Sequence, residues 1–308
     1  MSATQQGLMY CLAFVSLEAF QAVYLGAIFQ AVDSFLVGAW VFGISVVACT
    51  LATALLRPGE LINAGRAWRV VLALNLFAAL TWVAYFTAVQ LIEPAVVFTI
   101  FSGMVPIGAI VGAWLGLPEA KSRQNRFARA GQLTILASLL CLGTTTMLGF
   151  SGFAREGVWA ALAGVLFAAI SGGCTAFVIL YSVRLNSRGV GPLAQFGLRF
   201  VLYTILALAA FWWGLDDKGV PLGSDQLAAI VLIGLAVIAF PLYLVQKAVP
   251  LIPAPTIAAM TALGPAMVFL MQLFDGRIDY SNATLAGLVV YMAGALLTVH
   301  GAASTAKT

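Results

Sequence analysis

The stretch AVQLIEPAVVFTIFSGMVP, residues 88–106, has a near-copy in AVPLIPAPTIAAMTALGP, residues 248–265. In both copies a proline stands where a new apolar helix should begin, and a second proline falls inside that helix. A proline inside a helix donates no N–H and leaves the carbonyl four residues earlier without its helical partner. Those carbonyls belong to Ser102 and Thr261, and in a membrane they must be satisfied by neighbouring groups or face a wet cavity. We therefore expect helix breaks and gating positions at Pro94, Pro106, Pro253 and Pro265.

The composition indicates that lipid is the solvent. Of the 308 residues, 62% are hydrophobic and 8% are charged, and the mean hydropathy is +1.04. A soluble domain is roughly half apolar and about a quarter charged. The single histidine, His300, lies near the chain end, and the four cysteines fall in apolar runs without a CxxC pair. We expect neither a metal site nor a cofactor.

Apolar runs of about 20 residues, the length needed to cross a bilayer, occur ten times along the chain. The connections between them are short, which makes neighbouring runs antiparallel. The runs are residues 7–30, 34–56, 68–91, 94–116, 131–150, 157–181, 191–214, 225–247, 251–274 and 282–303.

Basic residues orient these runs, because Lys and Arg accumulate in cytoplasmic loops. With the N-terminus inside, eleven Lys and Arg residues fall on the inner side and three, Arg155, Lys218 and Arg277, on the outer side. Most acidic residues fall on the outer side. The chain is thus expected in a bacterial cytoplasmic (inner) membrane, with both termini in the cytoplasm.

The duplication extends beyond the opening motif. Gly7 and Leu12 of the first run recur as Gly157 and Leu162 of the sixth, at a constant offset. Because five helices make an odd number, the second half would enter the membrane from the opposite side, and such repeats support alternating access. The predicted fold class is an all-α integral membrane protein of ten transmembrane helices. Its domains are two inverted five-helix repeats, residues 1–150 and 151–308.

The ten runs, the two halves and the two proline-containing hairpins resemble the drug/metabolite transporter superfamily, in its EamA-type branch. The resemblance covers almost the whole chain and implies a secondary transporter. Members typically carry a Gly-Glu pair at the ends of the fourth and ninth helices. This chain has Leu117-Pro118-Glu119 and Asp275-Gly276-Arg277 there, so no member's substrate is carried over.

Two charged residues, Glu18 and Arg199, lie deep within the runs, away from their ends. Glu18 is midway through the first run, where a charge is costly unless it faces protein or water. It could bind a cationic group, take up a proton and couple transport to the proton gradient, or be a structural carboxyl. Arg199 lies a little over two turns into the seventh run. It could hold a carboxylate or phosphate, extend to the inner interface, or pair with Glu18.

Other candidates surround these two charges. Gln21 is one turn beyond Glu18 and Tyr24 continues that stripe, while polar and aromatic residues flank the duplicated motif. Each could instead have a structural role, either facing lipid or hydrogen-bonding a neighbouring helix. The full set of candidate substrate-binding residues is Glu18, Gln21, Tyr24, Trp82, Tyr85, Phe98, Ser102, Tyr181, Arg199, Tyr243, Gln246 and Thr261.

Glycines recur at four-residue spacing in the fourth run, at Gly108, Gly112 and Gly116. Such a stripe lets another helix approach closely, within the fold or between protomers. We expect packing within the fold, in a protein that is a monomer or a homodimer.

The favoured function is a secondary active transporter that exports small polar or amphipathic metabolites, such as amino acids or similar zwitterions, by alternating access driven by a gradient or by protons. An alternative is a carrier of organic cations that uses Glu18 and the aromatic residues. No nucleophile–base pair or HExxH motif is present, so we expect no catalytic residues and no enzyme. No ring of like charge indicates a channel. The expected partners are a small-molecule substrate and the lipid bilayer, without nucleic acid.

Overall fold

Helices and turns make up the described fold, in which no strand occurs. The computed structural model describes residues 2–120, 125–153, 157–219, 223–241, 244, 248, 251–252 and 254–305.

Eight segments in the described ranges are long and apolar enough to cross a membrane. Large apolar side chains cover their outer faces, as at Leu55 and Trp212, which are 83% and 86% exposed. Such surfaces suit lipid rather than water, so the chain is an integral membrane protein of the all-α class. The segments are α1 (Ala3–Ala31), α2 (Ser34–Leu56), α4 (Trp68–Leu91), α5 (Pro94–Trp114), α6 (Arg126–Met147), α7 (Val158–Asn186), α8 with α9 (Pro192–Trp212) and α14 (Asn282–Thr305).

Shorter helices complete the described structure. The expected run 191–214 is divided into two helices, and so is the expected run 251–274. Of the expected run 225–247, the structure describes a helix and the π-helical turn that follows it. These elements are α3 (Pro58–Arg66), η1 (Pro118–Ala120), α8 (Pro192–Arg199), α9 (Val201–Trp212), α10 (Ser224–Gly234), η2 (Leu235–Ala239), α12 (Ala254–Thr261) and α13 (Gly264–Gln272).

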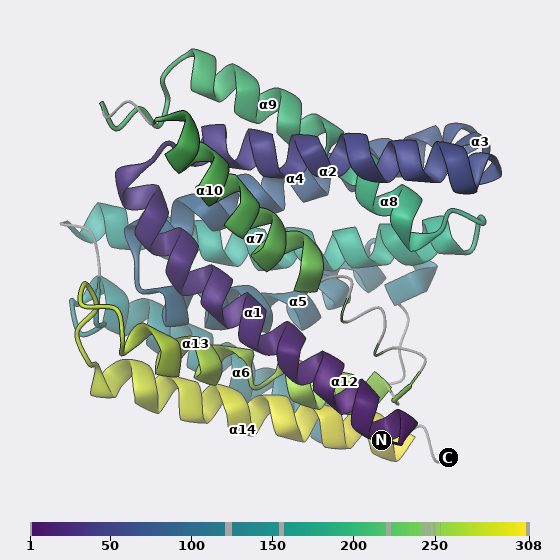
Figure 1. The fold of residues 1–308 in the computed structure, drawn as a ribbon. Helices are drawn as coiled ribbons and strands as arrows, with labels where there is room; N and C mark the ends of the chain where they lie inside the picture. Colours follow the sequence, from purple (N-terminus) through teal and green to yellow (C-terminus); the bar gives the residue numbers. More distant parts are fainter. Residues whose placement is uncertain are drawn as a thin grey trace.

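The long helices lie roughly side by side, so the bundle has two ends (Figure 1). One end carries both termini and α3, and we call it the terminal end. The other, which we call the hairpin end, carries the turns that join α1 to α2, α4 to α5 and α13 to α14. Each site residue can therefore be assigned a depth along its helix.

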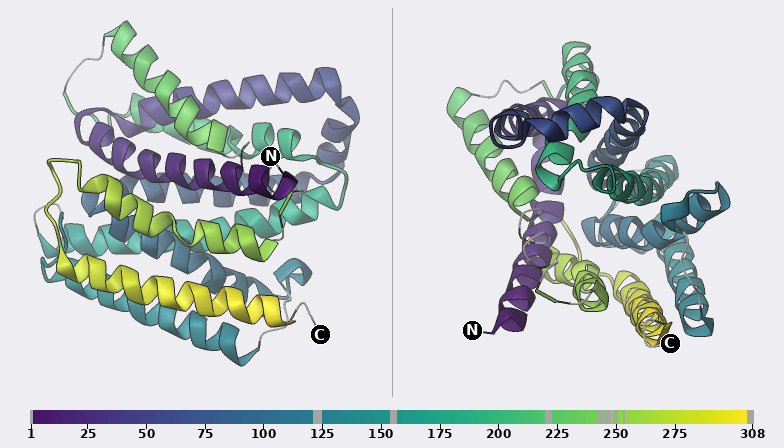
Figure 2. Two further views of the ribbon diagram at one scale, coloured as in Figure 1. Left: turned by 60° about the horizontal axis from the view of Figure 1, so that its bottom comes forward. Right: turned by 90° about the vertical axis from the view of Figure 1, so that its right-hand side faces the viewer.

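Small residues allow the closest helix contacts. A Cβ added at Gly108 or Gly112 of α5 would lie 2.7 Å from the Ala176 Cβ or 2.6 Å from the Leu180 Cδ1, both on α7. Gly108 and Gly112 thus pack within the fold, as expected, whereas Gly116 lies beyond the end of α5 and an added Cβ there would meet nothing within 4 Å. Helices α6 and α14 pack in the same way, since a Cβ at Gly131 would lie 2.5 Å from a backbone oxygen of α14. Figure 2 shows this pair side by side at one edge of the bundle.

Candidate functional site

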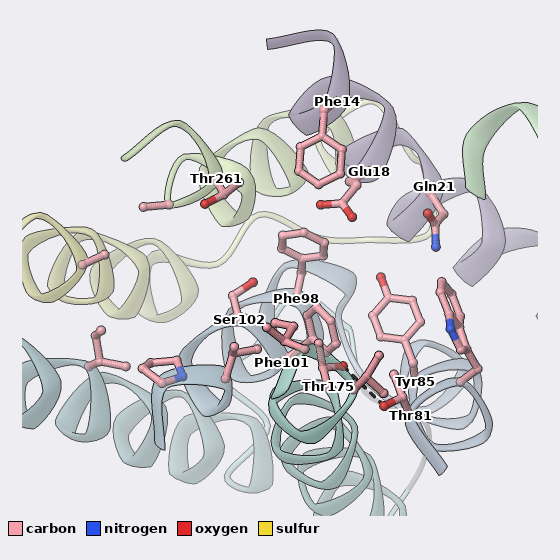
Figure 3. A pocket seen from close by; sticks show the side chains of 18 of the residues that line it. Phe14, Glu18, Gln21, Thr81, Tyr85, Phe98, Phe101, Ser102, Thr175 and Thr261 are labelled. Atoms are coloured by element: carbon pink, nitrogen blue, oxygen red, sulfur yellow. Dashed lines mark hydrogen bonds between the residues drawn. The ribbon is translucent and has the colours of Figure 1, made fainter. Parts of the chain in front are cut away.

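A cavity of about 690 Å³ lies in the middle of the bundle. Side chains of α1, α4, α5, α6, α7, α12 and α14 and of the α8–α9 junction surround it. Figure 3 shows polar groups from several of these helices pointing toward one space. The cavity lining includes eight of the residues expected from the sequence: Glu18, Gln21, Trp82, Tyr85, Phe98, Ser102, Arg199 and Thr261.

Glu18 is the acidic group of the cavity. Its carboxylate lies near the Phe98 ring, and the Gln21 amide and Tyr85 hydroxyl point into the same space (Figure 3). Glu18 and Gln21 share a face of α1 because three residues make nearly one helical turn. No described residue forms a hydrogen bond or an ion pair with the Glu18 carboxylate, which leaves both oxygens available to a ligand or a proton.

Aromatic side chains form a continuous wall of the cavity. Ring centroids are 6.0 Å apart for Phe98 and Phe101, 5.5 Å for Phe101 and Tyr85, and 5.9 Å for Tyr85 and Trp82. Trp82 lies 6.4 Å from Phe200, which adjoins the basic group of the site. The wall suits an apolar or flat ligand body.

Arg199 is the basic group of the cavity. Its guanidinium carbon lies 4.7 Å from the Phe196 ring centroid and 4.6 Å from that of Phe200. Its Nε is buried and has no hydrogen-bond partner among the described residues. Glu18 and Arg199 form no ion pair in this structure, so the alternative that they bind each other does not hold here.

Asn75 of α4 creates the break that places Arg199. Its side-chain amide donates to the Leu198 carbonyl over 2.8 Å, and its oxygen accepts from the Leu202 N–H over 3.0 Å. In an unbroken helix those two backbone groups would bond to each other. An inserted side chain is a recognised cause of a helix kink. Asn75 thus separates α8 from α9 beside the cavity.

The duplicated motif contributes from both copies, but in different shapes. Ser102 and Pro106 line the cavity, and so does Thr261. Helix α5 begins at Pro94 and continues through Pro106 to Trp114, so the break expected at Pro106 is absent. The second copy is interrupted between Thr261 and Gly264, with Pro265 in the first turn of α13, where a missing N–H costs nothing.

Two of the candidate binding residues that the structure describes, Tyr24 and Tyr181, are not in this lining. Tyr24 stacks on Phe20, with ring centroids 5.3 Å apart. Tyr181 stacks on Phe77 at 5.8 Å and packs under the Arg184 guanidinium. Tyr243 and Gln246 lie outside the described residues, as does the expected helix break at Pro253.

A buried carboxylate that the sequence analysis did not single out closes the hairpin end. Glu93, in the α4–α5 turn, is 0% exposed. It accepts hydrogen bonds of 2.7 Å from the Gly152 N–H and the Thr284 hydroxyl, and a third from the Gln272 amide. Burial raises the pKa of Glu93, and the three hydrogen bonds oppose that rise. Glu93 thereby joins the α4–α5 turn to the ends of α13 and α14.

A second network closes the other side of the hairpin end. Lys218 donates to Asp216 and, over 3.0 Å, to the Gln90 side-chain oxygen. The Ser34 hydroxyl donates to Asp216 over 2.7 Å. These contacts tie the chain after α9 to the start of α2 and the end of α4. Cavity-lining residues, by contrast, continue toward the terminal end as far as Val299.

No group of three or more His, Cys, Asp or Glu able to hold a metal ion occurs in the part of the chain that the structure describes.

No protein-family model and no curated protein sequence matches the chain. Solved structures do share its fold. A crystal structure, described only as that of a protein, is similar with a TM-score of 0.59 and 22% sequence identity, over 98% of this chain and 98% of its own. At this identity the likeness shows the fold and not the function.

Proposed function

We propose that this protein is a secondary active transporter of the drug/metabolite type, with ten transmembrane helices in two inverted five-helix repeats. The observation that carries the proposal is the central cavity, which has an unpartnered carboxylate on one helix and an arginine at the break of another. Ionisable groups inside a membrane are costly and typically mark a substrate or ion pathway. The bond networks at the hairpin end and the extension of the cavity toward the terminal end match one state of alternating access.

Helix contacts support the two repeats. Helix α1 packs on α12 and α13, while α7 packs on α5 and α4; α2 packs on α9, and α6 on α14. The halves can be exchanged so that α1 replaces α7, α5 replaces α12 and α13, and α4 replaces α10 with η2. The pairing of α1 with α12 and α13 then becomes that of α7 with α5, the pairing of α7 with α4 becomes the observed contact of α1 with η2, and the other two pairings become themselves. Such exchange symmetry is what a duplicated bundle requires.

The charge distribution supports an orientation. Among the described residues, the terminal end carries seven arginines, whereas the hairpin end carries Lys218 and Arg277. Basic residues favour the cytoplasmic side. We therefore place the terminal end and both chain termini in the cytoplasm of a bacterial cell, with the hairpin end outside, and assign the structure to an inward-facing state. The terminal-end arginines are Arg57, Arg66, Arg69, Arg126, Arg129, Arg184 and Arg188.

The substrate is assigned as a small polar or amphipathic metabolite, with amino acids and similar zwitterions as the first class to test. Glu18 would bind its ammonium group or take up the coupling proton. The aromatic wall beside Glu18 supports organic cations as the second class, because cations bind well over aromatic faces. The direction proposed is export, driven by exchange or by the proton gradient.

Counterflow in liposomes tests this proposal. Vesicles holding the purified protein would be loaded with an unlabelled amino acid or quaternary amine, and uptake of the labelled compound measured without and with a pH gradient. Wild type should show counterflow, and Glu18→Gln should lose the response to the pH gradient. Tyr24→Phe, a change on the same helix outside the cavity lining, is the matched control. Normal pH-dependent flux in Glu18→Gln would remove Glu18 from the mechanism, and no counterflow with either class would refute the transporter assignment.

A further inference from the structure

The α8–α9 junction presents a cation to the cavity. Arg199 is the last residue of α8, and Asn75 occupies the backbone groups on either side of it, the Leu198 carbonyl and the Leu202 N–H. Asn75 also donates to the Val71 carbonyl over 3.0 Å, which fixes the amide on its own helix. The position of Arg199 is therefore set by a tertiary contact and not by the flexibility of a loop.

The surroundings of this guanidinium are apolar. Two phenylalanine rings flank it at less than 5 Å, and the buried Nε has no partner among the described residues. Cation–π contacts offset part of the cost of removing the charge from water, but they leave the buried Nε–H without an acceptor among the described residues. Unpaired buried donors on a charged group are expensive. A ligand in the cavity that supplies the missing hydrogen-bond acceptors would offset this cost.

Two structural roles for Arg199 do not fit the geometry. An arginine that reaches the interface would direct its guanidinium to water at the terminal end, whereas this one lines the central cavity between rings. A structural ion pair needs a carboxylate within 4.0 Å, and no described Asp or Glu meets that distance from Arg199. The cavity is therefore the side from which a polar group can reach the guanidinium.

We propose that Arg199 is the anion-binding subsite of the cavity and that the substrate carries a carboxylate, which the planar guanidinium binds through paired N–H groups. The apolar body of the substrate then lies along the aromatic wall between Arg199 and the region of Glu18. This inference rests on the proposed function, since it selects carboxylate-bearing substrates over simple organic cations.

Protection of Arg199 from an arginine reagent tests the subsite on the wild-type protein. The purified protein is treated with phenylglyoxal, and the modified arginines are located by mass spectrometry. The probes are 3-phenylpropionate, phenethylamine and inorganic phosphate. We expect 3-phenylpropionate alone to slow modification of Arg199. Arg188, which is exposed at the terminal end, should react equally with every probe and serves as the internal control.

Variants add a second readout, the binding of the same probes followed by thermal shift. Arg199→Gln should weaken 3-phenylpropionate binding roughly 10- to 100-fold, the loss expected for a charge-assisted hydrogen-bonded pair. It should change phenethylamine binding little. Arg199→Lys keeps the charge without the planar fork and should fall between the two proteins. If Arg199→Gln does not fold, Arg199→Lys and the wild-type protection assay still decide.

The outcomes separate the subsite from the transport assignment. No protection of Arg199 by 3-phenylpropionate, or equal protection by phenethylamine, overturns the subsite even if counterflow is intact. Protection by inorganic phosphate and not by 3-phenylpropionate overturns the carboxylate assignment. Protection by 3-phenylpropionate without any counterflow upholds the subsite and overturns the proposed transport.

Discussion

Replacing Glu93 with Gln changes one oxygen of a fully buried carboxylate into an NH₂ group. Three donors converge on that carboxylate, from Gly152, Gln272 and Thr284. The Gln272 amide cannot rotate to present its oxygen to the new NH₂ group, because that oxygen already accepts from the Ala95 N–H over 3.0 Å. Whichever way the new amide is turned, its NH₂ faces the Gln272 NH₂ or the Gly152 N–H.

The expected cost follows from this mismatch. One hydrogen bond is lost and a buried donor is left unpaired, which costs about 1–3 kcal/mol of stability. A protonated Glu93 has no such defect, since its hydroxyl can accept from Gly152 and donate to Thr284 while its carbonyl oxygen accepts from Gln272. Neutral Glu and neutral Gln are therefore not equivalent here, although they have the same shape.

The pH dependence has a definite sign. Burial raises the pKa of Glu93 above the ordinary value of 4.5, despite the opposing hydrogen bonds. A raised pKa in the folded state means that folding takes up a proton, so this contribution is complete below pH 4.5 and is lost as pH rises through the folded pKa. The penalty of Glu93→Gln should thus be greatest in acid and shrink as pH rises.

Thermal unfolding in detergent at a series of pH values measures this difference. Asp217→Asn is the matched control at the hairpin end, because Asp217 is exposed and its side chain bonds, within the described ranges, only the nearby Gly219 N–H. The reasoning is refuted if Glu93→Gln is as stable as wild type in acid, or if the gap between them widens as pH rises.

Three further changes test other contacts. Asn75→Ala should cost roughly 1–2 kcal/mol and straighten the α8–α9 break, seen as a longer distance between spin labels at the far ends of those helices. Gly172→Ala would place a Cβ 2.1 Å from a backbone oxygen of α5 and should lower the melting temperature, at a cost of about 1–3 kcal/mol. Gly173→Ala, with nothing within 4 Å, should not. The bond from Arg184 lowers the pKa of Glu119 below 4.5, so its stabilising effect is present above that value and lost as pH falls. The stability gap between wild type and Glu119→Gln should therefore close on acidification, as thermal unfolding across pH would show.

The sequence predicted cavity-lining residues where their placement depends on residues nearby in the chain. Glu18 was found because a charge midway through an apolar run is costly, and Gln21 because one helical turn places it on the same face. Ser102 was found because a proline follows it at the spacing of a helical hydrogen bond. The same reasoning predicted Tyr24 on this face, but Tyr24 is not in the cavity lining. Each three-residue step rotates about 300° around a helix, so two steps carry a side chain about 120° off the face.

Features set by partners from distant helices could not be predicted. The α8–α9 break lacks a proline and is made by Asn75, over 120 positions earlier in the sequence. Glu93 falls in the short connection between two apolar runs, and donors from three distant segments bury it. A single sequence gives the turn and the residue type, but not the segments that pack on them.

The two networks at the hairpin end make a joint prediction about opening. Glu93 ties the α4–α5 turn to α13 and α14, whereas Lys218 and Asp216 tie the chain after α9 to α2 and α4. They share no hydrogen-bonding residue, so the stability costs of Glu93→Gln and Lys218→Met should add within about 0.5 kcal/mol. In the proposed transport cycle, opening the hairpin end requires both networks to break. A cysteine introduced at Gln21 should therefore become reactive to a membrane-impermeant thiol reagent, added from the hairpin side, far more in the double variant than in either single one. Equal labelling in the double and single variants would show that the two networks do not close a common gate.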